Sequence, residues 1–216
     1  MERLICVAIG YACGLFQTAY LIGKVYHTDM RKHGSGNLGS TNVMRTLGKK
    51  AGALNLLGDC LKCVVAILIA RAIYGRTQAD ILPLLSLYAA AGCVLGHNFP
   101  FYLKFKGGKG IAASVGLLLS FDIRIFAICA VVFFGLFFTT HYVSLGTLIV
   151  YVYAFIYILV AGQFGNYSMT QGHLVELYCV MGIMTALIVF RHRQNIVRLL
   201  SGTENKTFLT KKGKKE

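Results

Sequence analysis

Seven apolar runs alternate with polar segments along the 216 residues of the chain. They cover residues 4–23, 54–74, 81–96, 111–121, 125–140, 144–162 and 173–190. A helix needs about 20 apolar residues to cross the hydrocarbon core of a bilayer, and most of the runs approach that length. The pattern therefore predicts an all-α integral membrane protein, with one helical bundle formed by residues 1–216. The composition agrees, since 56% of the residues are hydrophobic and only 14% are charged.

The basic residues are concentrated in three of the polar segments. Residues 24–53, 102–110 and 191–216 hold six, three and eight of the 22 Lys and Arg residues. Because cytoplasmic loops are enriched in Lys and Arg, we predict that these segments are cytoplasmic and that the N-terminus lies outside. The net charge of +14 is then mainly a topology signal. It is compatible with membrane lipids or an anionic substrate as partners, and we predict no nucleic-acid partner.

The run 111–121 decides the number of spans. If residues 102–110 and 191–216 share one side, an even number of crossings separates them, and counting 111–121 gives seven spans in all. Its 11 residues would rise only about 16 Å as a helix, roughly half of the hydrocarbon thickness. We therefore expect this segment to be shielded by its neighbours, with a re-entrant segment and five spans as the alternative. The turn 141–143 then lies on the cytoplasmic side.

Charged and small residues also occur inside the apolar runs. Asp59 and Lys62 lie three apart, and because charges are costly there we expect a structural pair rather than a proton relay. Cys60 and Cys63 form an isolated C-x-x-C, which indicates packing, so we expect no metal and no cofactor. Five glycines are expected to permit close helix packing, namely Gly92, Gly96, Gly116, Gly146 and Gly182.

The first polar segment is dense in glycine, hydroxyl and amide groups between Gly34 and Arg45. Side chains such as Ser35 and Asn37 can orient a polyol or a phosphate, and an arginine can bind phosphate through two parallel hydrogen bonds. The alternative is a flexible loop in which Ser40 or Thr41 caps a helix that runs to Leu47.

The second polar segment contains three lysines and three glycines within residues 104–110. Glycines allow the backbone to turn its N–H groups toward an anion, and lysines add positive charge. The segment lacks the G-x-x-x-x-G-K-[ST] pattern, so it is not a Walker A motif. It precedes an apolar run, so we expect it at a helix N-terminus, where an anion is favoured. The alternative is a loop whose lysines only determine topology.

The third polar segment begins at Arg191. At helical spacing His192 and Asn195 share one face, as do Arg191 and Arg198, and the alternative is a basic helix bound to lipid head groups. The lysine-rich tail 211–215 is interpreted as solvated and lipid-facing. Ser144, which follows the turn 141–143, is interpreted as either a helix cap or a site hydroxyl.

Three ordered stretches carry a resemblance to a known family. They are GSGNLGSTNVMRTLGKK at 34–50, GHNFPFYLKFKGGKGIA at 96–112 and RHRQNIVRLLSGTE at 191–204. Together they resemble the bacterial acyl-phosphate:glycerol-3-phosphate acyltransferases, the PlsY family, over essentially the whole chain. The sequence departs from the family's pattern at Leu15, His141 and Thr147, where serine, arginine and serine are usual.

The resemblance implies a seven-span enzyme of the bacterial inner membrane with a site that faces the cytoplasm. It implies transfer of an acyl group from acyl phosphate to the 1-hydroxyl of glycerol 3-phosphate, in phospholipid biosynthesis. An enzyme that produces acyl phosphate would be the functional partner. The implied catalytic residues are Ser35, Arg45, Lys109, His192 and Asn195. The implied substrate-binding residues are Asn37, Lys104, Gly107, Gly108, Gly110 and Ser144.

The residues fit this chemistry, because both substrates carry phosphate. We expect Arg45, the lysines of 104–109 and His192 to supply positive charge, and loop N–H groups or Ser35 to stabilise the oxyanion. No histidine is followed by the His-x4-Asp acyltransferase pattern, and no serine lies in G-x-S-x-G. We therefore predict direct transfer without an acyl-enzyme, with the leaving phosphate or His192 accepting the hydroxyl proton.

Two other classes compete with this interpretation. An organic-phosphate transporter would also use basic glycine loops, but it predicts charged groups in broken helices at the middle of the bilayer. A membrane scaffold with a lipid-binding tail leaves the hydroxyl and amide groups of the first loop without a purpose.

Overall fold

The structure, a computed structural model, describes residues 1–208, and within them it is all-α. The predicted fold class is confirmed. Residues 209–216, which include the predicted lipid-facing lysines 211–215, lie outside the described residues. The α-helices are α1 (Glu2–Gly14), α2 (Thr18–Val25), α3 (Ser40–Leu47), α4 (Lys49–Tyr74), α5 (Leu82–Asn98), α6 (Ile111–Phe121), α7 (Ile123–Thr140), α8 (Val143–Gln163), α9 (Gln171–Arg191) and α10 (Arg193–Leu200). Short 3-10 turns lie at Met30–Lys32, Ala79–Ile81 and Phe101–Leu103.

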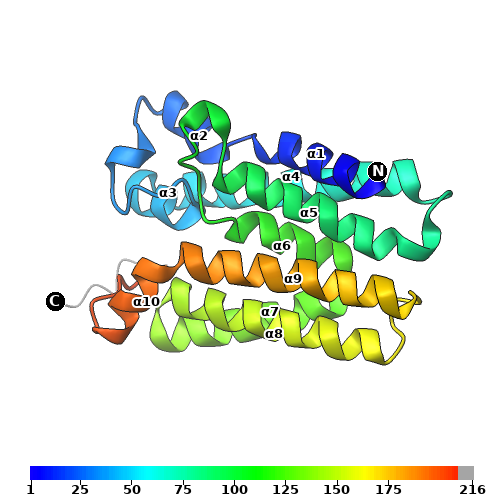
Figure 1. The fold of residues 1–216 in the computed structure, drawn as a ribbon. Coiled ribbons are helices and arrows are strands. Elements are labelled where there is room, and N and C mark those ends of the chain that lie inside the picture. Colours follow the sequence, from blue (N-terminus) through cyan, green and yellow to red (C-terminus); the bar gives the residue numbers. More distant parts are fainter. Residues whose placement is uncertain (209–216) are drawn as a thin grey trace.

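The polar segments gather at one end of the bundle. Figure 1 shows α2, α3 and α10 at this end, with the N-terminus at the opposite end. Within residues 1–208, the three basic segments therefore lie at one end of the bundle. Among the described residues, six segments are long and apolar enough to cross a membrane, and α6, with 11 residues, is shorter. Figure 1 shows α7 returning toward the end of the bundle where α6 begins. The span count and sidedness in a bilayer stay predictions.

The first apolar run is not one helix, although a single span over residues 4–23 is predicted. The helix breaks after Gly14 and resumes at Thr18. The side-chain amide of Gln17 donates to the carbonyl oxygens of Gly14, Gly96 and His97 at 3.1, 3.3 and 3.1 Å. The break is tolerated because the Gln17 amide nitrogen bonds these carbonyl oxygens inside the protein.

Glycines on α1 and α5 form a close helix crossing. Gly10 and Gly14 on α1 and Gly92 and Gly96 on α5 are each spaced by four. A Cβ atom added at any of the four would overlap a backbone carbonyl oxygen of the opposite helix. Close packing is therefore confirmed for Gly92 and Gly96, and a Cβ at Gly116 would likewise overlap the carbonyl oxygen of Cys60. The two remaining predicted glycines, 146 and 182, instead face phenylalanine rings.

Replacing Gly92 with alanine is expected to lower the free energy of unfolding by about 2 kcal/mol or more, because the backbone of Val7 cannot move away at low cost. Thermal unfolding in a mild detergent would measure the effect. Gly182→Ala is the matched control, since its added Cβ meets only the Phe155 ring, at 3.5 and 3.6 Å. Equal thermal midpoints for the two variants would contradict the close crossing.

Candidate active site

A carboxylate joins elements that are distant in the sequence. Glu204 follows α10, and its Oε1 accepts hydrogen bonds from Ser144 Oγ at 3.0 Å and from Asn195 Nδ2 at 2.7 Å. Its Oε2 pairs with Arg198 Nε at 2.7 Å. Ser144 lies in the first turn of α8 and is buried, so it acts as a hydroxyl of this cluster rather than as the cap of its helix.

The two other polar segments reach the same cluster. Lys109 Nζ donates to Asn195 Oδ1, and the amide nitrogen of the same Asn195 side chain donates to Glu204. Arg45, on α3, donates to the carbonyl oxygen of Asn205 at 3.1 Å and to Thr207 Oγ1. The structure therefore brings together four predicted site residues: Arg45, Lys109, Ser144 and Asn195.

The cluster carries more positive than negative charge. Burial and the positive charges of Arg198, Arg191 and Arg45 lower the pKa of Lys109 to about 8, although Glu204 raises it. Burial raises the pKa of Glu204, but hydrogen bonds from its three partners outweigh this and hold that pKa below its usual value. The ionised carboxylate of Glu204 thus lies near three cationic side chains, those of Arg45, Lys109 and Arg198. An added anion would relieve this imbalance, so the cluster suits a phosphate group.

His192 does not supply the positive charge that the sequence suggests. It is buried between α9 and α10, and burial together with Lys109 lowers its pKa to about 4. Its Nδ1 lies 2.8 Å from the carbonyl oxygen of Ile188. A carbonyl only accepts hydrogen bonds, so Nδ1 carries the hydrogen of the neutral ring and Nε2 is an acceptor. His192 is therefore neutral near pH 7 and can accept a hydrogen bond.

The helix break at His192 also separates two arginines. One continuous helix would place Arg191 and Arg198 on one face, but α9 ends at Arg191 and α10 begins at Arg193. Arg198 contacts Glu204, whereas Arg191 donates to the carbonyl oxygens of Gly107 and Gly108 at 3.2 and 2.6 Å. Both arginines act on the charge of Lys109, but their hydrogen-bond partners differ, and Arg191 holds the lysine-glycine loop.

Gly107 and Gly108 do not direct their N–H groups toward a ligand. Those groups donate to the carbonyl oxygens of Asn98 and His97, both at 3.1 Å. A Cβ at Gly107 would overlap the His97 carbonyl oxygen, and a Cβ at Gly108 would overlap the His97 ring. The prediction of an anion cradle is therefore wrong for these two glycines. They allow the loop to pack directly on the end of α5.

The loop ends at a helix N-terminus, as predicted. Gly110 precedes α6 with a φ of +85°, a conformation that favours glycine. The first N–H groups of a helix have no partner within it, and the helix dipole attracts an anion there. Since Lys109 comes directly before, the start of α6 is the part of this loop suited to a phosphate.

Asn42 organises the first loop. Its amide nitrogen donates to the carbonyl oxygens of Met30, His33 and Asn37 at 3.2, 3.0 and 3.1 Å. Its amide oxygen accepts from the backbone N–H of Ser35 at 2.9 Å. The helix that follows runs to Leu47 as predicted, but Gly39 is its N-cap residue rather than a hydroxyl side chain.

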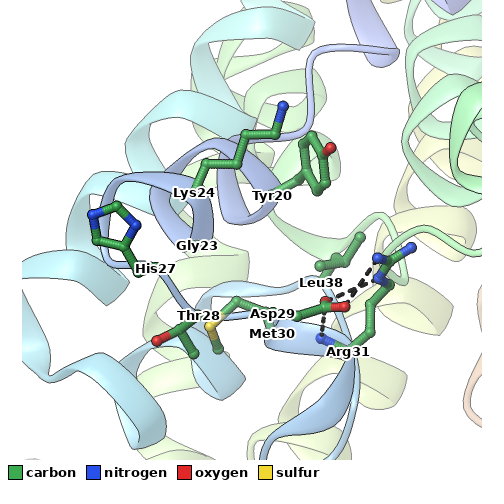
Figure 2. Close-up of a pocket in the computed structure, with 9 residues that line it drawn as sticks. All are labelled: Tyr20, Gly23, Lys24, His27, Thr28, Asp29, Met30, Arg31 and Leu38. Carbon is green, nitrogen blue, oxygen red and sulfur yellow. Dashed lines mark hydrogen bonds and ion pairs between the residues drawn. The ribbon is translucent and has the colours of Figure 1, made fainter.

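Three predicted site residues lie outside the cluster. Ser35 and Lys104 are exposed, and within residues 1–208 neither these two nor Asn37 donates a side-chain hydrogen bond to the cluster. A separate pocket of ≈ 330 Å³ opens beside the first loop and contains none of the predicted site residues (Figure 2). Lys24, Arg31 and Leu38 are among its lining residues, and Arg31 is already paired with Asp29 at 2.9 Å.

The predicted site omits Glu204, Arg198 and Thr207, which complete the cluster. Glu204 has a signal in the sequence, because it is the first acidic residue after a run of basic residues that begins at Arg191. Thr207 has none, since its contact with Arg45 depends on how the chain folds back after α10.

Comparison with known proteins shows the family of this chain. A family model described as Glycerol-3-phosphate acyltransferase matches residues 4–202. The chain is 41% identical to the Glycerol-3-phosphate acyltransferase of Bacillus cytotoxicus, over 95% of this chain and 96% of that protein. It is also 40% identical to the Glycerol-3-phosphate acyltransferase of Clostridioides difficile (strain 630), over 94% of each.

Two solved structures have the same fold. One is the crystal structure of PlsY, an integral membrane glycerol 3-phosphate acyltransferase, in its glycerol 3-phosphate form. It matches with a TM-score of 0.82 and 33% identity over 96% of each chain. The other is the lysophosphatidic acid form, with a TM-score of 0.80 and 32% identity over 97% of each chain.

Proposed function

This chain belongs to the glycerol-3-phosphate acyltransferase family, and from that premise we propose that it transfers a fatty acyl group from acyl phosphate to the 1-hydroxyl of glycerol 3-phosphate. It is an acyltransferase and a multi-pass membrane protein. The products would be lysophosphatidic acid and phosphate. Glycerol 3-phosphate as acceptor is supported by the structure of a relative in its glycerol 3-phosphate form.

The observation that carries the proposal is the convergence of three polar segments on one cationic cluster. Arg45, Lys109 and Arg198 come from different segments and surround a single ionised carboxylate. Two phosphate-bearing substrates need such an excess of positive charge. Lys109 and the start of α6 would hold one phosphate, and Arg45 and Asn195 would hold the other.

The proposed reaction is a direct transfer. The 1-hydroxyl oxygen attacks the acyl carbonyl carbon, the bond from that carbon to the phosphate oxygen breaks, and phosphate leaves. The hydroxyl proton passes to the leaving phosphate. A phosphate has a second pKa of about 6, closer to neutral pH than the pKa of about 4 of His192, and is therefore the better base. His192 Nε2 would accept the hydroxyl hydrogen bond and orient the nucleophile.

The location follows from the same proposal. The cluster lies at the end of the bundle that carries the basic segments, which would face the cytoplasm of a bacterium. The protein would then use glycerol 3-phosphate and acyl phosphate made there, with the acyl-phosphate-producing enzyme as its functional partner. A transporter is disfavoured because this cationic cluster lies at one end of the bundle and not at its middle.

A purified-protein assay tests the proposal. The protein in detergent would receive glycerol 3-phosphate with acyl phosphate, acyl-CoA or acyl carrier protein as the donor, and lysophosphatidic acid would be measured. We expect product with acyl phosphate and without any membrane gradient. Formation of product only with acyl-CoA would refute acyl phosphate as the donor. A trapped covalent acyl-enzyme would refute direct transfer.

The activity should fall at alkaline pH. Lys109 has a pKa of about 8 in the free protein, so it is protonated below this pH and loses its charge above it. The phosphate of glycerol 3-phosphate is fully ionised throughout this range. We expect kcat/KM for glycerol 3-phosphate at pH 8 to be about half of its value at pH 7, and to fall above pH 8 by up to about tenfold per pH unit. The Lys109→Arg variant should lose this decline, and a wild-type profile that stays level to about pH 9.5 would contradict a role for the charge.

A further inference from the structure

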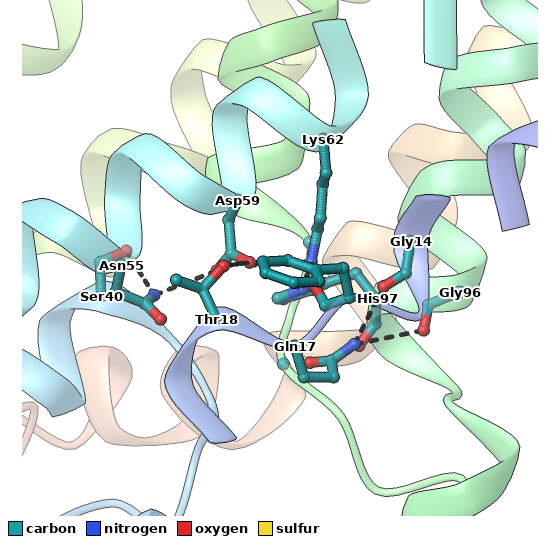
Figure 3. A network of polar contacts seen from close by, with 12 residues as sticks. Gly14, Gln17, Thr18, Ser40, Asn55, Asp59, Lys62, Gly96 and His97 are labelled. Carbon is teal, nitrogen blue, oxygen red and sulfur yellow. Dashed lines mark hydrogen bonds and ion pairs between the residues drawn. The ribbon is translucent and has the colours of Figure 1, made fainter. Parts of the chain in front are cut away.

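A polar network is buried among α1, α4 and α5 and does not belong to the cationic cluster (Figure 3). The predicted pair is confirmed, since Lys62 Nζ lies 2.8 Å from Asp59 Oδ1 and the two side chains are only 5% and 1% exposed. Lys62 also donates to the carbonyl oxygen of Phe16 and to His97 Nδ1, both at 2.8 Å. An ammonium group has three N–H donors, so all of them are used.

These bonds determine the state of His97. Because the Lys62 ammonium can only donate, Nδ1 of His97 is the acceptor and the neutral ring carries its hydrogen on Nε2. That nitrogen faces Gly108, where an added Cβ would overlap it, and the Gly108 N–H donates to the His97 carbonyl oxygen at 3.1 Å. His97 therefore supports the loop one residue before Lys109.

The network continues in the other direction to the helix that carries Arg45. Asp59 Oδ2 accepts from Asn55 Nδ2 at 3.0 Å, and the same nitrogen donates to Ser40 Oγ at 2.9 Å. Ser40 is the first residue of α3. A continuous series of contacts thus runs from α3 through Asn55, Asp59, Lys62 and His97 to the loop that ends at Lys109.

We infer that Asp59, Lys62 and His97 are positioning residues that set Arg45 and Lys109 at the separation needed to bind the two phosphates. This inference rests on the proposed function. Stability alone does not explain the network, because a buried ion pair often stabilises a fold less than apolar residues of similar size do. Charged groups in a spanning helix are costly and mark functional regions, and here both ends of the network meet the elements that carry the site.

Two substitutions of His97 separate positioning from folding. In His97→Asn, the amide oxygen replaces Nδ1 and still accepts from Lys62, but no atom reaches Gly108. We expect a thermal midpoint close to that of the wild type, with kcat/KM for glycerol 3-phosphate lower by about tenfold to a hundredfold, mainly through a higher KM. In His97→Gln, the side chain reaches Gly108, but Lys62 loses the hydrogen-bond acceptor that Nδ1 of His97 provides. We expect a lower thermal midpoint and a smaller kinetic loss.

Ser86→Ala is the matched control. Ser86 is also buried on α5 and accepts from Arg71 at 3.2 Å, but it belongs to a different set of contacts. Its KM should stay within about twofold of the wild-type value. The rate of trypsin cleavage at the exposed Lys104 and Lys106 reports how firmly the loop is held, and it does not depend on the enzymatic activity of the protein. Cleavage should be faster in His97→Asn than in Ser86→Ala.

The outcomes distinguish this inference from the proposed function. An inactive wild-type protein would refute the proposed function, while the trypsin comparison would still report whether His97 holds the loop. A wild-type KM and unchanged cleavage in His97→Asn would overturn the inference. So would equal losses of thermal midpoint in both His97 variants with no change in KM.

Discussion

Replacing Lys109 with alanine is expected to lower kcat/KM for glycerol 3-phosphate about a hundredfold. Lys109 Nζ donates to Asn195 Oδ1 and lies among three arginines at the start of α6. A hydrogen bond from a charged group to a phosphate contributes about 1.5–3 kcal/mol, and each 1.4 kcal/mol corresponds to about tenfold. Initial rates of lysophosphatidic acid formation, at saturating acyl phosphate and varied glycerol 3-phosphate, would measure the loss.

Lys106→Ala is the matched control for this experiment. Lys106 lies in the same loop and carries the same charge, but it is exposed. We expect its kcat/KM to stay within about twofold of the wild-type value, because an exposed charge is screened. Equal losses in the two variants would show that the loop acts only through its total charge. Full activity of Lys109→Ala would show that Lys109 has no role in the site.

Replacing Gly107 with alanine is expected to reduce kcat/KM by about a hundredfold for a different reason. The added Cβ would overlap the backbone carbonyl oxygen of His97, and no side-chain rotation can relieve this overlap because the backbone fixes the position of a Cβ. The loop must then shift, and Lys109 moves with it. A misplacement of about 1 Å at a reacting group can cost about a hundredfold in rate. The kinetic loss should exceed the change in thermal stability, because the loop lies at the end of the bundle.

Gly135→Ala tests whether any glycine substitution would do the same. Gly135 lies within α7, and an added Cβ there meets no atom within 4 Å. Its kinetics and its thermal midpoint should match those of the wild type. If Gly107→Ala is equally active, the contact of the loop with the end of α5 does not position Lys109.

Much of the fold could be predicted because its causes are local. Each helix satisfies its own backbone hydrogen bonds, and the bilayer sets the length of an apolar run, so the runs predict α4, α8 and α9 closely. The distribution of Lys and Arg along the sequence likewise predicted that the basic segments lie on the same side. The break between α1 and α2 was not predictable, because Gln17 and Phe16 bond to groups on α5 and α4.

The sequence predicted which segments would supply polar and cationic side chains to one cluster. Arg45, Lys109, Ser144 and Asn195 do meet, as their chemistry suggested. The roles of individual atoms were less predictable. A glycine-rich sequence does not reveal whether its N–H groups face a ligand or a carbonyl, and in Gly107 and Gly108 they face α5.

The lysine-glycine loop and its surroundings have some properties that the sequence determines and others that depend on the tertiary structure. Sequence alone determined that the loop lies between apolar runs, precedes a helix and carries positive charge, since these depend on residue type and spacing. Only the tertiary structure decided that Glu204 is the centre of the cluster, that His192 is neutral and that Lys109 has a lowered pKa. The protonation of a group depends on its burial and on nearby charges, and here those charges come from segments that meet only in the folded bundle.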